Sequence, residues 1–214
     1  MNNMTIRAIS GSIIVAIFIA LFFLNSQGAT FAVYLTITTV ILGEISFNTK
    51  KQNGSKIIEY IAYTYVCTPI LFIAYLFCVY GDNCDINNIF FMSLLTACVF
   101  DTSAYLGGKM LKGPKIAPSI SPAKTISGTL IGFLSVLVLY NFVLHRELLQ
   151  TFSTAFVCSC GAFFGDLLQS KFKRVLGIKD MGILIPGHGG FGDRFDGLIG
   201  VILVNMLLYL LKSL

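Results

Sequence analysis

The sequence predicts an all-α, polytopic integral membrane protein with about seven transmembrane helices, and three observations support this prediction. Of its 214 residues, 56% are hydrophobic and 12% are charged, about half the charged share of a typical soluble domain. Several apolar segments approach the roughly 20 residues that a helix needs to cross a bilayer. The connecting loops alternate between basic and nearly uncharged. Because no long polar stretch remains for a soluble domain, we expect a single membrane domain over 1–214.

Each apolar segment is expected to form a spanning helix, because isolated strands would leave backbone groups unpaired in lipid. The expected helices are 8–25, 29–47, 57–80, 88–107, 127–144, 151–170 and 197–213. The first is preceded by Arg7 like a signal peptide, but it lacks a small-residue cleavage site, so we expect it to be retained. Loop 107–126 is too rich in Gly and Pro for a continuous helix. A short helix within 111–126 or 180–192 is an open alternative.

Positive charge is concentrated on one side of the predicted membrane. All cations except Arg146 and Lys212 lie near the N-terminus or in the loops after every second span. The opposite side carries Asp82 and Asp85. Cytoplasmic loops of membrane proteins are enriched in Lys and Arg, so we expect the N-terminus and the basic loops to be cytoplasmic. The six cysteines lie mostly in apolar segments without metal-site spacing, and we interpret them as small buried hydrophobic residues.

A short stretch, 166–196, combines acids, cations and glycines that the rest of the chain lacks. Asp166 lies near the end of an apolar segment, where a charge is costly unless it is paired or functional. On a continuous helix, Ser170, Lys173 and Arg174 follow on the same face. Asp166 would then lie deeper in the membrane than the two cations, an arrangement that suits a metal-bound phosphate. The alternative interpretation of Asp166 is a buried Asp–Lys pair that orients helices.

Two further acids, Asp193 and Asp196, are three residues apart and face the same way on a helix that begins at Gly192. Their hard oxygen atoms suit Mg²⁺, which binds through one or two carboxylates plus substrate phosphate. Asp166 is a candidate shared ligand in a two-metal arrangement. The alternative is that these acids stabilise the helix N-terminus through its dipole.

His188 lies in a glycine-rich loop before that helix. Gly187, Gly189 and Gly190 allow backbone N–H groups to approach an anion. His188 could then donate to a phosphate or protonate a leaving group, and the alternative is a solvated turn residue.

A second polar cluster lies around loop 107–126. Its members are Asp101, Tyr105, Lys109, Ser121, Lys124 and Thr125. The N–H groups at the start of the following helix can receive a phosphate. A basic loop that contacts anionic lipid head groups is the alternative, but it does not explain the intramembrane Asp101. Glu44 and Glu59 lie near helix ends, and we interpret them as pairing partners for nearby lysines at 50, 51 and 56.

These motifs resemble those of the phosphatidate cytidylyltransferase (CDP-diacylglycerol synthase) family over about residues 95–214. The C-terminal motif comprises Ser170, Lys173, Arg174, Lys179, Asp180, Pro186-Gly-His188-Gly189-Gly190, Asp193, Arg194 and Asp196. Two further motifs, in the family's order, are Asp101-x-x-Ala104-Tyr105-x-x-Gly108-Lys109 and Ser121-Pro122-x-Lys124-Thr125. The family has Glu where Gln169 and Ser127 stand here, and many members have one or two more N-terminal spans.

The resemblance implies an enzyme that converts CTP and phosphatidic acid to CDP-diacylglycerol and pyrophosphate in phospholipid synthesis. It implies N-terminal helices in 1–87 and a catalytic half in 88–214. It also implies a binuclear metal centre on Asp166 and Asp193, with Asp196 close by, that requires Mg²⁺ and takes K⁺ as the second ion. We expect a multi-pass protein of the inner (plasma) membrane with its active site facing the cytoplasm. Expected partners are CTP, phosphatidic acid, membrane lipid and a second copy in a homodimer, without nucleic acid.

On this interpretation, each motif residue has an expected role. The expected catalytic residues are Asp166, Lys173, Arg174, His188, Asp193 and Asp196. The expected substrate-binding residues are Asp101, Tyr105, Lys109, Ser121, Lys124, Thr125, Ser170, Lys179, Asp180, Gly189, Gly190 and Arg194.

Other functions stay open. A CTP-dependent polyprenol or phytol kinase, or a cytidylyltransferase for another lipid phosphate, would use the same groups. An ion-coupled secondary transporter would use Asp101 and Asp166 as intramembrane ion sites, but it leaves the Gly-His-Gly-Gly loop unexplained. A catalytically inactive scaffold would fit the residues Gln169 and Ser127.

Overall fold

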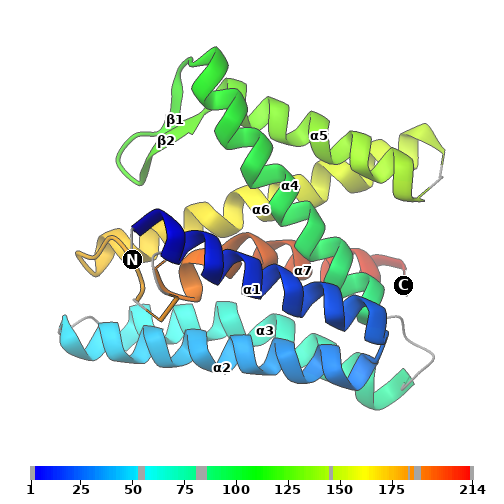
Figure 1. The fold of residues 1–214 in the computed structure, drawn as a ribbon, viewed down its shortest axis with the longest axis horizontal. Helices are drawn as coiled ribbons and strands as arrows, with labels where there is room; N and C mark the ends of the chain where they lie inside the picture. The colour runs from blue at the N-terminus through cyan, green and yellow to red at the C-terminus, as the bar shows by residue number, and fades with distance from the viewer. Residues whose placement is uncertain are drawn as a thin grey trace. The chain divides into compact units, whose positions relative to one another are not determined.

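A computed structural model describes residues 3–52, 56–80, 86–144, 147–182, 184–185 and 189–212 (Figure 1). Within these residues the chain is almost entirely helical, which confirms the predicted all-α class. The helices are α1 (Asn3–Leu24), α2 (Gln27–Lys51), α3 (Lys56–Tyr80), α4 (Ile86–Leu111), α5 (Ile126–Leu144), α6 (Leu148–Val175) and α7 (Gly192–Lys212). Two short strands, β1 (Lys115–Ala117) and β2 (Ser121–Thr125), lie between α4 and α5.

Six of the described helices, α2 to α7, are long and apolar enough to cross a membrane. In α1 the apolar part, Ile9–Leu24, is shorter than these spans. The prediction of a multi-pass membrane protein is therefore confirmed, while the side on which the N-terminus lies stays a prediction.

The segment between α4 and α5 forms an antiparallel β-hairpin, visible in Figure 1, with Lys115 opposite Thr125. Helix α4 continues to Leu111, beyond the predicted end, and the chain then turns at Gly113. The φ angle of Gly113 is +119°, a conformation that residues with a Cβ rarely adopt. The prediction that this loop cannot be a continuous helix is confirmed, and the alternative of a short helix at 111–126 is wrong.

The chain divides into two compact units. Unit 1 comprises residues 1–91 and 172–195, and unit 2 comprises residues 92–171 and 196–214. The boundaries fall within α4, α6 and α7, so each of these helices contributes residues to both units.

Unit 1 contains α2 and α3, which pack against each other. Helix α2 begins after Ser26, whose hydroxyl oxygen accepts the N–H of Ala29 at 3.3 Å and so caps the helix. Its buried residues recur every three or four positions and include Tyr34, Ile41 and Ile45. Glu44 and Asn48 lie in the same buried stripe. Because buried polar groups are almost always hydrogen-bonded, these two side chains require partners.

Unit 2 has a core formed by α4, α5, α6 and α7. Its fully buried members include Phe100, Val136, Cys158 and Val201. Helices α6 and α7 approach closely, because a Cβ atom on Gly161 would lie only 2.8 Å from the carbonyl oxygen of Gly200. Small residues of this kind allow close helix packing in membranes. The interpretation of the cysteines as buried is confirmed for Cys158 and wrong for Cys78 and Cys98, which are exposed.

Candidate functional site

In unit 1, Asp193 occupies the first turn of α7 and is almost fully enclosed by partners. Its Oδ1 lies 2.7 Å from the Nζ of Lys173, and the two side chains are 8% and 12% exposed. Its Oδ2 accepts the N–H of Met181 at 2.8 Å and the N–H of Gly190 at 3.0 Å. The predicted helix start at Gly192 is confirmed, and Asp193 holds together the last turns of α6, the following loop and the start of α7.

Glu44 of α2 reaches the same segment from a distant part of the chain. Its Oε1 accepts the N–H of Phe191 at 3.0 Å, and its Oε2 accepts the N–H of Gly192 at 2.9 Å. The interpretation of Glu44 as a partner of nearby lysines is wrong, because both carboxylate oxygens bind backbone donors instead. Glu59 likewise accepts the hydroxyl of Tyr63 at 2.8 Å.

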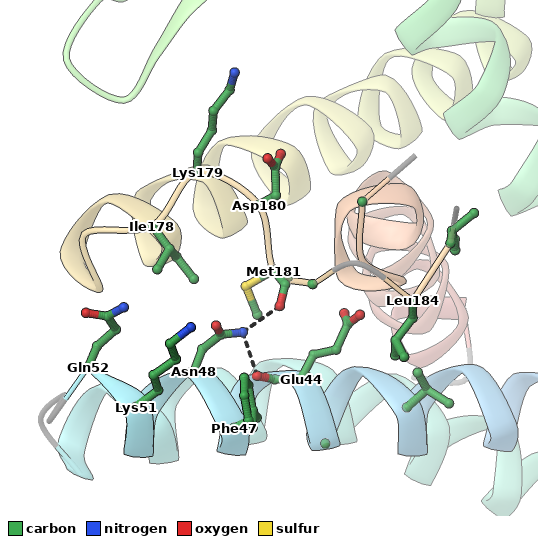
Figure 2. Close-up of a pocket in the computed structure, with 15 residues that line it drawn as sticks. Glu44, Phe47, Asn48, Lys51, Gln52, Ile178, Lys179, Asp180, Met181 and Leu184 are labelled. Carbon is green, nitrogen blue, oxygen red and sulfur yellow. Dashed lines mark hydrogen bonds between the residues drawn. The ribbon is translucent and has the colours of Figure 1, made fainter. Parts of the chain in front are cut away.

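Asn48, one turn after Glu44, contacts the loop as well. Its Nδ2 donates to the carbonyl oxygen of Met181 at 2.5 Å and to that of Glu44 at 2.8 Å. Figure 2 shows both side chains projecting from α2 toward the segment around Met181. They line a pocket of about 1100 Å³ between α2 and the described residues 178–182, 184–185 and 189, whose walls are mostly apolar.

The loop before α7 depends on glycine at two positions. Gly189 has φ +91°, in the region that favours glycine, and its carbonyl oxygen accepts the N–H of Ile185 at 2.9 Å. A Cβ on Gly190 would lie 2.6 Å from Oε1 of Glu44 and 2.7 Å from the backbone nitrogen of Gly182. The sequence predicts that glycines here allow the backbone to approach an anion. In the structure, the anionic group that lies against Gly190 is the carboxylate of Glu44.

The remaining predicted residues of unit 1 lie at its surface. Lys179, Asp180, Arg174 and Arg194 are exposed. The guanidinium Nη1 of Arg174 donates to the carbonyl oxygen of Ile178 at 3.3 Å. His188 lies outside the described residues, so its predicted role stays a prediction.

In unit 2, Asp166 of α6 is bound on both carboxylate oxygens. Its Oδ2 lies 2.6 Å from the Nζ of Lys124, with side chains 26% and 15% exposed. Its Oδ1 accepts the hydroxyl of Ser170 at 3.1 Å, as the spacing on one helix face predicts. The ammonium of Lys124 also lies 4.9 Å from the centroid of the Phe163 ring, a cation–π distance. The alternative interpretation of Asp166 was a buried Asp–Lys pair that orients helices. Such a pair is present, and its cation is Lys124.

Asp101 joins this group through its electrostatic interaction with Asp166 and Lys124. A Cβ on Gly197 of α7 would lie 3.3 Å from Oδ2 of Asp101, so α7 packs directly over this acid. Asp196 is 8% exposed, and its Oδ1 accepts the N–H of Gly197 at 2.8 Å. Unit 2 thus brings Asp101 and Lys124 of the second motif together with Asp166, a grouping that the spacing of these residues did not predict.

The hairpin places the basic and hydroxyl residues of the second motif. Lys124 lies in β2, while Thr125 ends that strand and its Oγ1 accepts the N–H of Gly128 at 3.2 Å. Thr125 therefore caps α5 itself and uses one of the N–H groups that were predicted to receive a phosphate. Ser121 starts β2 and is partly exposed.

Tyr105 and Lys109 are exposed on α4. Of the two positions at which the resemblance implies Glu, Gln169 is buried, and the hydroxyl of Ser127 donates to the carbonyl oxygen of Lys112. Neither position carries a negative charge that could contribute to a metal site.

No group of three or more His, Cys, Asp or Glu side chains in the described part of the chain is arranged to hold a metal ion. The donor chemistry nevertheless fits Mg²⁺, because each ionised carboxylate offers about four lone-pair sites. The hydrogen bonds and ion pairs described above occupy two sites of Asp166 and three of Asp193. These contacts leave about two acceptor positions on Asp166 and about one on Asp193 unused.

Sequence analysis did not identify Glu44 and Asn48 as site residues. Glu44 is an ionisable residue within an apolar span, and such residues are candidate functional positions. The lysines at 50, 51 and 56, which follow within two turns of helix and a short loop, offer a nearer set of partners in the sequence.

Comparison with known proteins identifies the family. The model of the family described as "Cytidylyltransferase family" matches residues 3–212. A phosphatidate cytidylyltransferase of Rickettsia bellii is 32% identical over 228 residues, which cover 100% of this chain and 92% of that protein. One from Rickettsia typhi is 33% identical over 213 residues, covering 92% and 88%.

A shorter match is more similar. The phosphatidate cytidylyltransferase of Rickettsia conorii is 43% identical over 123 residues, and the aligned part spans 52% of each chain. In this match the chain spans about half the length of its relative. Because the family match extends over nearly the whole sequence, the resemblance predicted from the motifs is confirmed and the chain belongs to the cytidylyltransferase family.

Proposed function

We propose that this protein is a phosphatidate cytidylyltransferase, which transfers the cytidylyl group of CTP to phosphatidic acid and releases pyrophosphate. The observation that carries the proposal is the match to relatives of that name over 100% and 92% of this chain. The membrane-spanning helices, and two partly buried lysines that could contact phosphate, are consistent with such a reaction. The substrates are a cytosolic nucleotide and a lipid, so the enzyme must work at the membrane boundary.

The reaction requires two anionic substrates to approach each other. A phosphate oxygen of the lipid attacks the α-phosphorus of CTP, a new P–O bond forms, and the bond to the β-phosphate breaks as pyrophosphate leaves. Because the attacking oxygen is already ionised, little general-base assistance is required. Positioning and electrostatic stabilisation should supply most of the rate enhancement, as in other phosphoryl-type transfers.

In unit 2, Lys124 is the principal candidate for a phosphate contact. Its ammonium is partly buried beside Asp166 and above Phe163, so it is fixed in place before a substrate binds. A phosphate that enters here would share the ammonium with Asp166, and Ser121 at the other end of β2 would add a hydroxyl donor. The electrostatic interaction of Asp101 with both residues of the ion pair makes it a candidate for orienting the lysine.

In unit 1, Lys173 and Arg174 are the candidate phosphate-binding cations. Lys173 is held by Asp193, whereas Arg174 is exposed and can bind a phosphate through two parallel N–H groups. Lys179 and Arg194 add exposed positive charge to the same unit. These side chains would neutralise the triphosphate and the lipid head group.

Asp166, Asp193 and Asp196 are the residues that we propose to hold Mg²⁺, with K⁺ as a second ion. When bound, Mg²⁺ would neutralise charge on the reacting phosphates. The chain's own contribution is to orient the carboxyl groups of Asp166 and Asp193, through the lysine, hydroxyl and backbone donors described above. His188 is proposed only as an additional phosphate donor.

We further propose that the site faces the cytoplasm of the inner membrane, because nearly all Lys and Arg residues lie on one side of the predicted spans. CTP would then reach the phosphate-binding cations from solution while the acyl chains of the lipid remain in the bilayer. A homodimer stays a prediction.

Radiolabelled CTP tests the proposed reaction against the kinase alternative. Purified protein is incubated with Mg²⁺, phosphatidic acid and CTP labelled in either the α- or the γ-phosphate. Cytidylyl transfer places only the α-label in the lipid fraction. A lipid fraction that carries only the γ-label would identify a kinase, and label in neither case would reject cytidylyl transfer to phosphatidic acid.

A further inference from the structure

The structure joins α2 to the start of α7 by a set of buried hydrogen bonds that the proposed reaction does not use. We propose that Glu44 and Asn48 are positioning residues that fix the segment before α7 and thereby hold Asp193 in its working orientation. We call this set of contacts the α2 latch. The inference rests on the function proposed above, because it assigns Asp193 a part in that reaction.

Glu44 holds the end of the segment that leads into Asp193. Its two oxygens accept the N–H groups of Phe191 and Gly192 at 3.0 Å and 2.9 Å. The first N–H groups of a helix have no partner within the helix, and a negative charge is favourable at that end. Glu44 is 6% exposed, so these bonds are shielded from water. They fix the two residues immediately before Asp193.

Asn48 holds the other end of the same segment. Its Nδ2 donates to the carbonyl oxygen of Met181 at 2.5 Å, while the N–H of Met181 donates to Oδ2 of Asp193 at 2.8 Å. Residue 181 is therefore bound by α2 on one side and by Asp193 on the other. A shift of α2 would move a direct hydrogen-bond donor of Asp193.

The loop is shaped to admit the carboxylate of Glu44. A Cβ on Gly182 or on Gly190 would lie 2.6 Å from Oε1 of Glu44, closer than real Cβ atoms come to other groups. An apolar residue at position 44 could pack on an apolar helix, but it could not accept the two N–H groups. Because an acid within a spanning segment is otherwise unfavourable, its hydrogen bonds to the loop explain why glutamate stands at this position.

Hydrogen exchange and kinetics on the full-length protein in detergent test the latch with Glu44→Ala, Glu44→Gln and the matched control Glu59→Gln. Glu59 lies on the neighbouring helix and accepts a bond from Tyr63. In Glu44→Ala we expect the Phe191 and Gly192 amides to exchange about 10-fold faster or more, since hydrogen bonds to charged groups are the stronger ones. Glu44→Gln keeps one acceptor oxygen and should be intermediate, and Glu59→Gln should match the wild type.

The kinetic result separates positioning from mere stability. In folded, extractable Glu44→Ala, kcat should fall by about 10- to 100-fold, because a misplacement of about 1 Å can have that effect. The KM for CTP should stay close to the wild-type value, because Glu44→Ala removes none of the proposed phosphate-binding cations. Glu44→Gln should restore part of kcat.

The outcomes distinguish this inference from the proposed function. Unchanged amide exchange in Glu44→Gln and Glu44→Ala, or unchanged kcat in an active enzyme, would overturn the positioning role alone. A KM for CTP that rises as much as kcat falls would also overturn it. Wild-type protein that forms no CTP-dependent lipid product would overturn the proposed function instead.

Discussion

Replacing Lys173 with methionine removes one partner of a buried ion pair. The Nζ of Lys173 lies 2.7 Å from Oδ1 of Asp193, and the side chains are 12% and 8% exposed. Methionine keeps most of the apolar stem but leaves the carboxylate without its cation. Breaking a buried pair by removing one partner typically costs about 3–5 kcal/mol.

The lower end of that range applies here, because Asp193 keeps the N–H donors of Met181 and Gly190 at 2.8 Å and 3.0 Å. For a chain of this size, about 1 kcal/mol shifts the melting temperature by about 2–4 °C. A loss of about 3 kcal/mol therefore predicts a melting temperature lower by about 6–12 °C.

The assay follows the exposure of a buried thiol. The chain contains no tryptophan, but Cys158 is 0% exposed, so its reaction with a fluorogenic thiol reagent in detergent reports unfolding after the exposed thiols have reacted. Lys171→Met, an exposed lysine on the same helix, is the matched control and should melt like the wild type. An equal melting temperature for Lys173→Met would refute the reasoning that this pair is buried and stabilising.

Three further predictions follow from the described contacts. Lys124→Met should raise the KM for CTP by about 10-fold or more, since one phosphate ion pair is lost. The exposed control Lys115→Met should keep the wild-type KM, and an unchanged KM in Lys124→Met would contradict the phosphate role. Gly190→Ala places a Cβ 2.7 Å from a backbone nitrogen and should destabilise the protein by about 1–3 kcal/mol, whereas Gly43→Ala, with nothing within 4 Å, should not; equal melting temperatures would count against the close approach. Lys179→Cys in a cysteine-free background should react with an impermeant thiol reagent only from the cytoplasmic side, and labelling only from outside would reverse the orientation.

Much of the fold follows from local pattern. Apolar segments near the length of a bilayer span predict the helices, and the Gly-Asp-Arg start of α7 is visible in the sequence. Helical spacing also predicts the bond from Ser170 to Asp166, because both residues lie on one helix. The β1–β2 hairpin was not predicted, since Lys115–Ala117 and Ser121–Thr125 are too short to show an alternating pattern.

The partners of the charged groups could not be predicted in the same way. Lys173 was expected to bind phosphate directly, but in the structure it pairs with Asp193, 20 residues later. Glu44 accepts N–H groups 147 and 148 residues away. Such contacts depend on how α2 and the loop before α7 fold together, and nothing in the spacing of charges near Glu44 indicates backbone donors from a distant loop.

The most direct test of the central claim is pyrophosphate release by the purified protein. With CTP, phosphatidic acid and Mg²⁺ present together, the wild type should release one pyrophosphate for each lipid product, and omission of the lipid should stop release. Asp166→Asn and Asp193→Asn should each abolish the reaction while the protein stays folded and extractable. No lipid-dependent release from folded wild-type protein, or near wild-type turnover in either variant, would contradict the account.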